Sequence, residues 1–122
     1  MKDHLRLIYM AGGADYTIVP LNKILESQHK LVQVYTKHPK PKGRGKKVLL
    51  NSLQNFLDKN NLAYSMPDNY KALEEIRKIK ELKPDVIIVF SYGQILPQTI
   101  LDVPKIGSLN IHASLLPKWR GP

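Results

Sequence analysis

Short apolar runs alternate along the chain with segments whose apolar residues recur at helical spacing. The run from Val86 to Phe90 has five consecutive apolar residues, which indicates a strand buried on both faces, as in the interior of a parallel sheet. The other runs are shorter and lean towards β-branched and aromatic residues. The pattern predicts extended segments over 5–10, 31–36, 63–66, 86–90 and 107–112.

Three amphipathic helices are predicted between these strands. The first spans 17–28 and the second 46–60, each with apolar residues three and four positions apart. Asp68 is predicted to cap the third helix, which ends before Pro84. The segment 37–45 is rich in proline, glycine and lysine, so it is predicted to be a loop.

Alternation of strands and helices indicates βαβ units, and hence a fold class. We expect an α/β protein with a Rossmann-like parallel sheet and helices on both faces. Such a sheet binds its ligands outside the carboxyl ends of the strands. The segments 11–16, 90–97 and 110–121 should therefore converge on one rim of the sheet.

Composition narrows the class of protein. A length of 122 residues suits one domain, and no apolar run approaches the roughly 18 residues that span a bilayer. The chain has no cysteine, which excludes disulfides and a thiolate nucleophile. No pair of histidines has a metal-binding spacing, so we expect no metal. With no recognisable secretory signal at its start, the chain is predicted to be cytoplasmic.

The net charge of +9 is concentrated in one stretch. Lys37 to Lys47 contains six lysines and arginines and no acidic residue; without it, 13 basic and 10 acidic residues leave a net charge of +3. A local basic patch is typical of a surface that meets phosphates. The alternative is a solvated loop that keeps the chain soluble.

Asn110 and His112 are the candidate catalytic pair. They lie two residues apart on a predicted strand, so both side chains project from the same face. An asparagine N–H can stabilise a developing oxyanion and a histidine can donate or relay a proton, which suits acyl or formyl transfer. The alternative is that both side chains only satisfy nearby backbone groups.

Two further segments are candidates for a ligand pocket at the same rim. The turn Ser114, Leu115, Leu116 and Pro117 can form one wall for a flat organic ligand, or it can be an ordinary apolar anchor. In the segment after Phe90, Gly93 permits close approach of the backbone to a ligand, or the segment is a plain exit from the strand. Neither Gly12-Gly13 nor the glycines of the basic stretch have the spacing of a nucleotide-binding motif.

The segment 108–121, Ser-Leu-Asn-Ile-His-Ala-Ser-Leu-Leu-Pro-Lys-Trp-Arg-Gly, closely resembles the folate-dependent formyltransferases. The segment 91–97, Ser-Tyr-Gly-Gln-Ile-Leu-Pro, is similar to the same family. Within the family, the loop 39–47 resembles the members that formylate methionyl initiator tRNA in translation initiation.

The resemblance implies a Rossmann-like domain that moves a formyl group from 10-formyltetrahydrofolate to the amino group of methionyl initiator tRNA. It implies that Asn110 and His112 are two of three catalytic residues. The residues that the resemblance assigns to folate binding are Tyr92, Gly93, Ile95, Ser114, Leu115, Leu116 and Pro117. Those that it assigns to tRNA binding are Lys40, Lys42, Arg44, Lys46 and Lys47.

The chain departs from the family pattern in two ways. Gly12-Gly13-Ala14 stands where the family has Gly-Thr-Pro. The third catalytic residue, an aspartate, and a C-terminal β-barrel domain would follow Pro122. We therefore expect residues 1–122 to be the N-terminal part of a formyltransferase domain with little activity alone. The intact enzyme is expected to be a monomer away from membranes, whereas the fragment could self-associate through uncovered apolar surface.

Two alternative functions remain. A formyltransferase acting on an amino-sugar nucleotide or another small amine would share the same pair and pocket but would not need the basic loop. A non-catalytic remnant that binds folate or RNA would need neither the aspartate nor the missing domain.

Overall fold

The structure is a computed structural model that describes residues 3–39, 41–42, 47–48, 50–70 and 73–112. Its strands are β1 (Arg6–Ala11), β2 (Lys30–Tyr35), β3 (Pro41–Lys42), β4 (Lys47–Val48), β5 (Tyr64–Ser65), β6 (Val86–Phe90) and β7 (Gly107–Ile111). Its helices are the 3₁₀ turn η1 (Asp15–Thr17), α1 (Ile18–Glu26), α2 (Ser52–Lys59), α3 (Leu73–Glu81) and α4 (Gln98–Leu101).

Five strands form a parallel sheet in the order β5-β2-β1-β6-β7. The chain first builds outward from β1 to β2 and β5, and then returns to the other side of β1 with β6 and β7. This order is that of a doubly wound sheet, in which the crossover helices cover both faces. The predicted Rossmann-like α/β fold is therefore confirmed.

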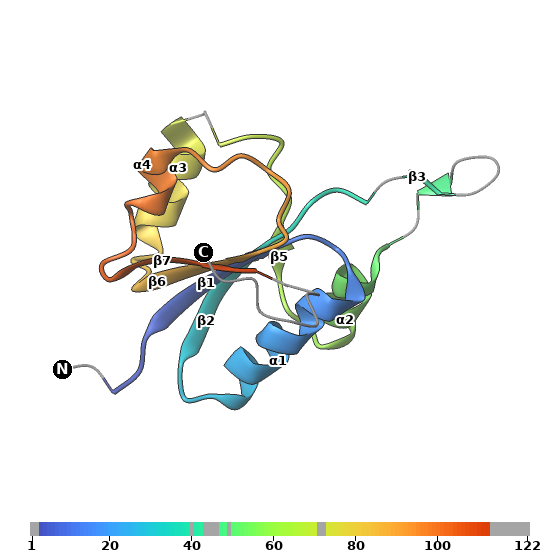
Figure 1. Ribbon diagram of the computed structural model, residues 1–122, viewed down its shortest axis with the longest axis horizontal. Helices are drawn as coiled ribbons and strands as arrows, with labels where there is room; N and C mark the ends of the chain where they lie inside the picture. The colour runs from blue at the N-terminus through green and yellow to red at the C-terminus, as the bar shows by residue number, and fades with distance from the viewer. Residues whose placement is uncertain (1–2, 40, 43–46, 49, 71–72, 113–122) are drawn as a thin grey trace, which may run out of the picture.

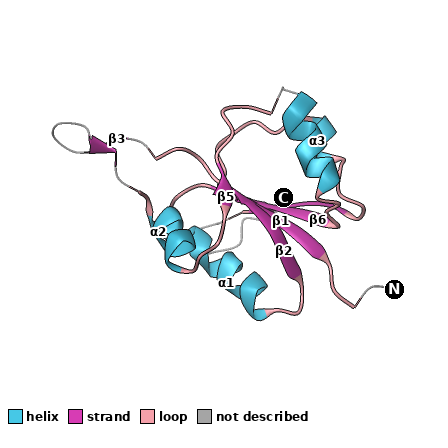
Figure 2. Cartoon of the chain, turned by 180° about the vertical axis from the view of Figure 1, so that it is seen from behind, coloured by secondary structure: helices cyan, strands magenta, loops and turns pink. Residues whose placement is uncertain are grey.

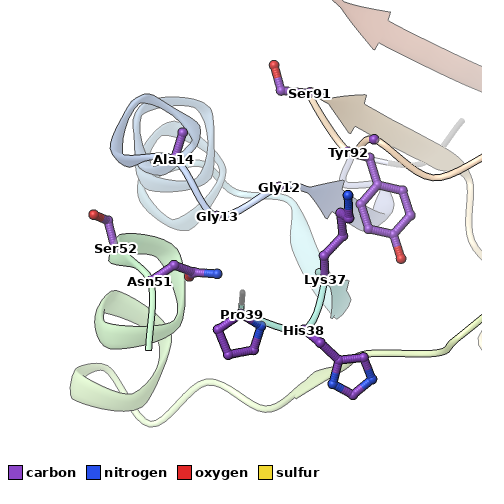
Figure 3. A pocket seen from close by; sticks show the side chains of 11 residues that line it. Gly12, Gly13, Ala14, Lys37, His38, Pro39, Asn51, Ser52, Ser91 and Tyr92 are labelled. Carbon is purple, nitrogen blue, oxygen red and sulfur yellow. The ribbon is translucent and has the colours of Figure 1, made fainter. Parts of the chain in front are cut away.

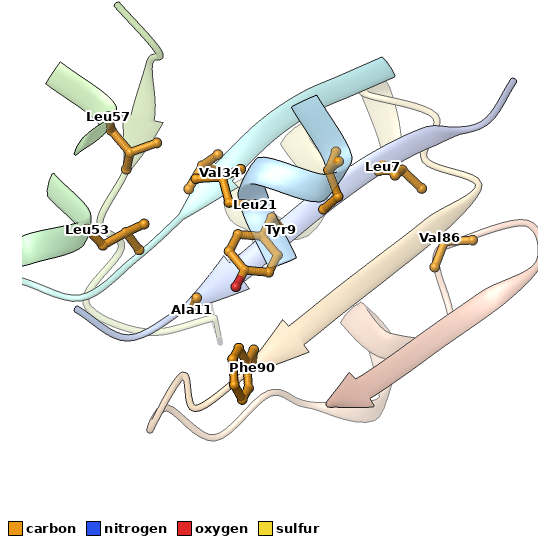
Figure 4. Packing of buried hydrophobic residues seen from close by; sticks show 10 residues of the cluster. Leu7, Tyr9, Ala11, Leu21, Val34, Leu53, Leu57, Val86 and Phe90 are labelled. Carbon is orange, nitrogen blue, oxygen red and sulfur yellow. The ribbon is translucent and has the colours of Figure 1, made fainter. Parts of the chain in front are cut away.

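The sheet is the middle of three layers (Figure 1). Helices α1 and α2 cover one face, while α3 and α4 cover the other, as the reverse view also shows (Figure 2). Because successive side chains of a strand point to opposite faces, β1 contributes to both cores. Tyr9 packs with Leu21 and Leu53 below α1 and α2 (Figure 4), whereas Ile8 packs with Ile79 of α3.

Helix α2 begins later than the predicted 46–60, and this prediction was wrong at its start. Asn51 forms a capping box, because its side chain accepts a hydrogen bond from Gln54 N at 2.8 Å and Gln54 Oε1 accepts one from Asn51 N at 3.1 Å. Residues 47–48 instead form β4, which pairs with β3 in a separate antiparallel ladder. Because β3 (Pro41–Lys42) lies within 37–45, the segment predicted to be a loop contains a short strand.

The predicted cap of the third helix was also wrong. Helix α3 begins at Leu73, beyond Asp68, and the Asp68 carboxylate instead lies 3.2 Å from His38 Nε2. The short helix α4 was not predicted, because four residues between two loops leave little periodic pattern. Among the helices formed by the described residues, none has the length and apolar character that a membrane crossing requires.

The order of the strands reverses between β1 and β6, and there the two strand ends are tied together. Gly12 N donates a hydrogen bond of 3.0 Å to Ser91 O. A Cβ added at Gly12 would overlap that carbonyl oxygen, so only glycine permits this approach. A crevice at such a switch point is where sheets of this type bind ligands.

Candidate functional site

Two of the three predicted rim segments are in direct contact at the carboxyl ends of the strands. Tyr16, which follows β1, donates its hydroxyl to Ser91 Oγ at 3.1 Å and packs its ring 5.3 Å from that of Phe90. The third segment, where β7 ends, lines a cavity together with both of them. The predicted convergence is confirmed for the described part of these segments.

The rim cavity has a volume of about 470 Å³. Its lining residues are Tyr16, Val89, Ser91, Tyr92, Gly93, Gln94, Asn110, Ile111 and His112. Asn110 lies opposite Val89 in the parallel ladder of β6 and β7, and His112 follows the last residue of β7. Both residues are exposed, and both line this cavity. Their amide and imidazole groups can hydrogen-bond one oxygen of a small substrate.

A second cavity, the β7 cavity, lies against the α4 side of β6 and β7 and has a volume of about 310 Å³. Its apolar lining is formed by Val89, Leu96, Leu101 and Leu109, and its polar lining by Gln94, Ser108 and Asn110. Asn110 therefore belongs to both this cavity and the rim cavity. Apolar walls with a few polar groups suit a flat heterocycle.

The predicted folate residues of the 91–97 segment lie in different environments. The Tyr92 side chain is buried, and its hydroxyl lies 2.7 Å from that of Tyr70, so only its backbone faces the rim cavity. Gly93 has a φ of 75°, a left-handed conformation that favours glycine, and it lines the rim cavity. Ile95 is 92% exposed and is not among the residues that line the rim or β7 cavities.

The tyrosine pair is a buried polar contact beneath the rim. Burial raises the pKa of the Tyr70 phenol, and its hydrogen bond with Tyr92 raises it further. Burial also raises the pKa of Tyr92. Gln94 Nε2 donates to Pro67 O at 3.0 Å, so two contacts fix the 92–94 turn to the segment before α3. Both phenols stay protonated near neutral pH and act as a structural support.

A third cavity, the α2 cavity, opens on the other side of Ser91–Gly93 and has a volume of about 410 Å³ (Figure 3). The rest of its lining comes from the turn after β1, the residues after β2, and the start of α2. These residues are Gly12, Gly13, Ala14, Lys37, His38, Pro39, Asn51 and Ser52.

The predicted tRNA-binding stretch is described only in part. Lys42 and Lys47 face each other as Cα partners in the β3–β4 ladder, which stands away from the main sheet (Figures 1 and 2). Lys40, Arg44 and Lys46 lie outside the described residues. Ser114, Leu115, Leu116 and Pro117, the predicted folate turn, also lie outside them.

Sequence reasoning missed several residues that line these cavities. Leu96, Leu101 and Leu109 had no distinguishing pattern, because isolated leucines in loops, short helices and edge strands are common. Asn51 did carry a signal, since Asn-Ser-Leu-Gln has the spacing of a capping box and marks the start of α2. Among the described residues, no three acidic, histidine or cysteine side chains are grouped closely enough to hold a metal ion.

Comparison with known proteins gives relatives along the whole chain. Methionyl-tRNA formyltransferase of Ehrlichia ruminantium (strain Gardel) is 45% identical over 118 residues, which cover 96% of this chain and 39% of that enzyme. The corresponding enzyme of Hydrogenovibrio crunogenus is 40% identical over 99% of this chain and 38% of its own length. The chain thus spans well under half of the length of these relatives.

Solved structures agree in fold. Phosphoribosylglycinamide formyltransferase from Brucella melitensis superposes with a TM-score of 0.59 at 21% identity, covering 98% of this chain and 62% of that one. At that identity the likeness concerns the fold alone. The family model described as formyl transferase matches residues 6–122, nearly the full sequence. The chain therefore belongs to the formyl transferase family.

Proposed function

We propose that the protein transfers a formyl group from 10-formyltetrahydrofolate to the amino group of methionyl initiator tRNA. The observation that carries this proposal is the 40–45% identity, along nearly the whole chain, to relatives named methionyl-tRNA formyltransferase. A role in translation initiation places the protein in the cytoplasm. Formyl transfer needs three things of this chain: a place for the folate, polar groups at the reacting carbon, and a surface for RNA.

The β7 cavity is our choice for the heterocycle of the folate. Its apolar walls can sandwich a flat ring, while Gln94 and Asn110 offer hydrogen bonds to the ring edge. The Ser108 hydroxyl already donates to Leu101 O at 2.8 Å, so it braces the cavity wall. The backbone of Tyr92 and Gly93 lies at the adjoining rim, where the formyl-bearing nitrogen of the folate would lie.

In the reaction, the amino nitrogen of the aminoacyl group attacks the formyl carbon directly. The new C–N bond forms, the carbonyl oxygen becomes an oxyanion, and the bond from carbon to the folate nitrogen then breaks as the proton of the attacking amine passes to that nitrogen. Asn110 and His112 line the cavity where this carbon would lie, and their N–H groups would stabilise the oxyanion. No covalent enzyme intermediate is required.

The basic stretch favours an RNA acceptor over a small amine. Six lysines and arginines between residues 37 and 47 suit contacts to phosphates along a nucleic acid strand. A small amine does not require a surface of this size. An amino-sugar nucleotide remains the second candidate acceptor, because it could use the same rim and β7 cavities.

A formylation assay with each acceptor tests the proposal. The full-length protein is incubated with 10-formyltetrahydrofolate and either charged initiator tRNA or an amino-sugar nucleotide, and the formylated product is measured. We expect product with methionyl initiator tRNA and none above background with the sugar nucleotide. Product with the sugar nucleotide alone would overturn the proposed acceptor.

A further inference from the structure

The α2 cavity contains a half-buried cation that the proposed formyl transfer does not use. Lys37 follows β2, and its ammonium group lies between Gly12 and the ring of Tyr92 (Figure 3). The place of a Cβ at Gly93 would be 3.0 Å from Lys37 Nζ, so the glycine leaves room for this group. Within the described residues, no acidic side chain forms an ion pair with Lys37. A cation withdrawn from water without a carboxylate favours an anionic ligand.

Asn51 adds a second donor to the same cavity. Its side-chain oxygen is held by Gln54 N at 2.8 Å, and its amide nitrogen points into the cavity (Figure 3). The Leu53 N–H is also occupied, since it donates to Gly13 O at 3.3 Å. The Asn51 amide group, which the capping box holds in place, is therefore available as a donor to a ligand.

The position of the Asn51 amide group requires a glycine at residue 13. A Cβ added at Gly13 would overlap the Asn51 amide nitrogen. The Gly-Gly-Ala turn after β1 and the asparagine at the start of α2 thus fit together as one wall of the cavity. A side chain at residue 13 would displace the donor.

We propose that the α2 cavity binds a phosphodiester of the acceptor RNA strand, with the Lys37 ammonium and the Asn51 amide as its donors. The inference rests on the proposed function, because it takes the acceptor to be RNA. The cavity meets the rim cavity at Ser91–Gly93, and the β3–β4 segment starts just beyond Pro39. An RNA strand bound by the basic stretch, residues 37–47, would pass this cavity before its aminoacyl end reached Asn110. Lysine is well suited to such a phosphate contact.

A thermodynamic cycle tests the contact. The protein and its Lys37→Met variant are titrated with an acceptor-stem RNA hairpin with a single-stranded 3′ end. Each of the three terminal phosphodiesters is replaced in turn by a neutral methylphosphonate. At one linkage we expect the variant and the neutral linkage each to weaken binding about tenfold, and their combination to weaken it no further. Lys30→Met is the matched control, because Lys30 is exposed at the other end of β2. The fold-change in RNA affinity caused by Lys30→Met should be independent of that caused by the neutral linkage, so that the two fold-changes multiply.

If the Lys37→Met substitution and the neutral linkage had additive effects on the free energy of RNA binding at all three linkages, the assignment would be overturned. If methionyl initiator tRNA were formylated while the cycle was additive, this inference would fail and the proposed function would stand. Loss of both formylation and RNA binding would reject the proposed function itself. A parallel titration with inorganic phosphate tests whether the cavity instead binds the phosphate group of a small molecule. Lys37-dependent binding of free phosphate with an additive RNA cycle would assign the cavity to a small phosphorylated ligand instead. Equal melting temperatures of the three proteins show that they are folded.

Discussion

Asn110 and His112 are the proposed catalytic pair, and the end of β7 positions both of them at the rim cavity. A residue of the strand and the residue just after it line one cavity, together with Tyr16 and Ser91. Both side chains are exposed, so a substrate can reach them. A hydrogen bond made only to the developing oxyanion accelerates the chemical step without tightening substrate binding.

In the full-length protein, Asn110→Ala and His112→Ala should each lower kcat for formyl transfer by about 10²-fold or more, the scale of one lost oxyanion donor. The free energy of unfolding should change little, because neither side chain is buried. Asn55→Ala and His4→Ala are matched controls at exposed positions away from the rim. Turnover is measured with saturating tRNA and folate. Unchanged turnover in both Asn110→Ala and His112→Ala would contradict the assignment of the catalytic pair.

The tyrosine pair under the rim gives a prediction about stability. Tyr70→Phe leaves the buried Tyr92 hydroxyl without this partner and should cost about 1–3 kcal/mol of unfolding free energy, as should Tyr92→Phe. The double variant removes both polar groups, so its cost should be less than the sum of the two. Urea denaturation of the four proteins measures this cycle. A strictly additive cycle would show that the two hydroxyls do not interact.

Among the elements, the β3–β4 ladder forms a sheet of its own. Lys42 and Lys47 are paired in this ladder, apart from the five-stranded sheet. We propose that this charged segment serves RNA binding rather than folding.

Replacing Lys42, Arg44, Lys46 and Lys47 by glutamine should weaken binding of initiator tRNA and reduce its dependence on salt. Each lost phosphate contact lowers the slope of log K against log salt by about 0.7–0.9. Folate binding should be unchanged, because the rim and β7 cavities lie elsewhere. Filter binding from low to high salt measures the slope. An unchanged slope would mean that the stretch is only a solvated loop.

Long apolar runs made the sheet predictable, and short local signals decided where the helices begin. Val86–Phe90 was recognised as an interior strand because burial on both faces leaves no polar position in it. The start of α2 was missed because apolar spacing continues upstream of Asn51, and only the capping box shows where the helix begins. Asp68 is an acceptable cap by residue type, but its contact with His38 depends on tertiary structure.

At the scale of the whole molecule, strand order decides where chemistry is possible. The order of the strands reverses between β1 and β6, and the rim cavity lies beside the turn that follows β6, at the carboxyl ends of the strands. The sequence alone could predict this rim and the pair on β7, since both follow from the alternation of elements. It could not predict the α2 cavity, whose lining comes from segments far apart along the chain.

Buried phenols make the stability of the whole molecule sensitive to alkali. Burial raises the pKa of Tyr35 to about 12, with smaller contributions from the charges of Glu75 and Tyr92. Since the folded-state pKa lies above the unfolded value near 10, this contribution to stability is complete below pH 10. It is lost as pH rises from 10 to 12, by about 1.4 kcal/mol per pH unit.

Urea denaturation at several pH values from 8 to 11 measures the effect. Stability should fall above pH 10, and Tyr35→Phe should reduce the slope of that fall. Val19→Ala, which alters an exposed side chain that carries no titratable group, should leave the slope as it is. Equal slopes in all three proteins would contradict burial of the Tyr35 phenol.

A crystal structure with a non-reactive reduced-folate analogue tests the central claim most directly. We predict that the ring lies in the β7 cavity between Val89 and Leu101, and that its side chain leaves past Asn110 towards His112. A ring bound in the α2 cavity, or with Asn110 and His112 facing away from it, would contradict the account.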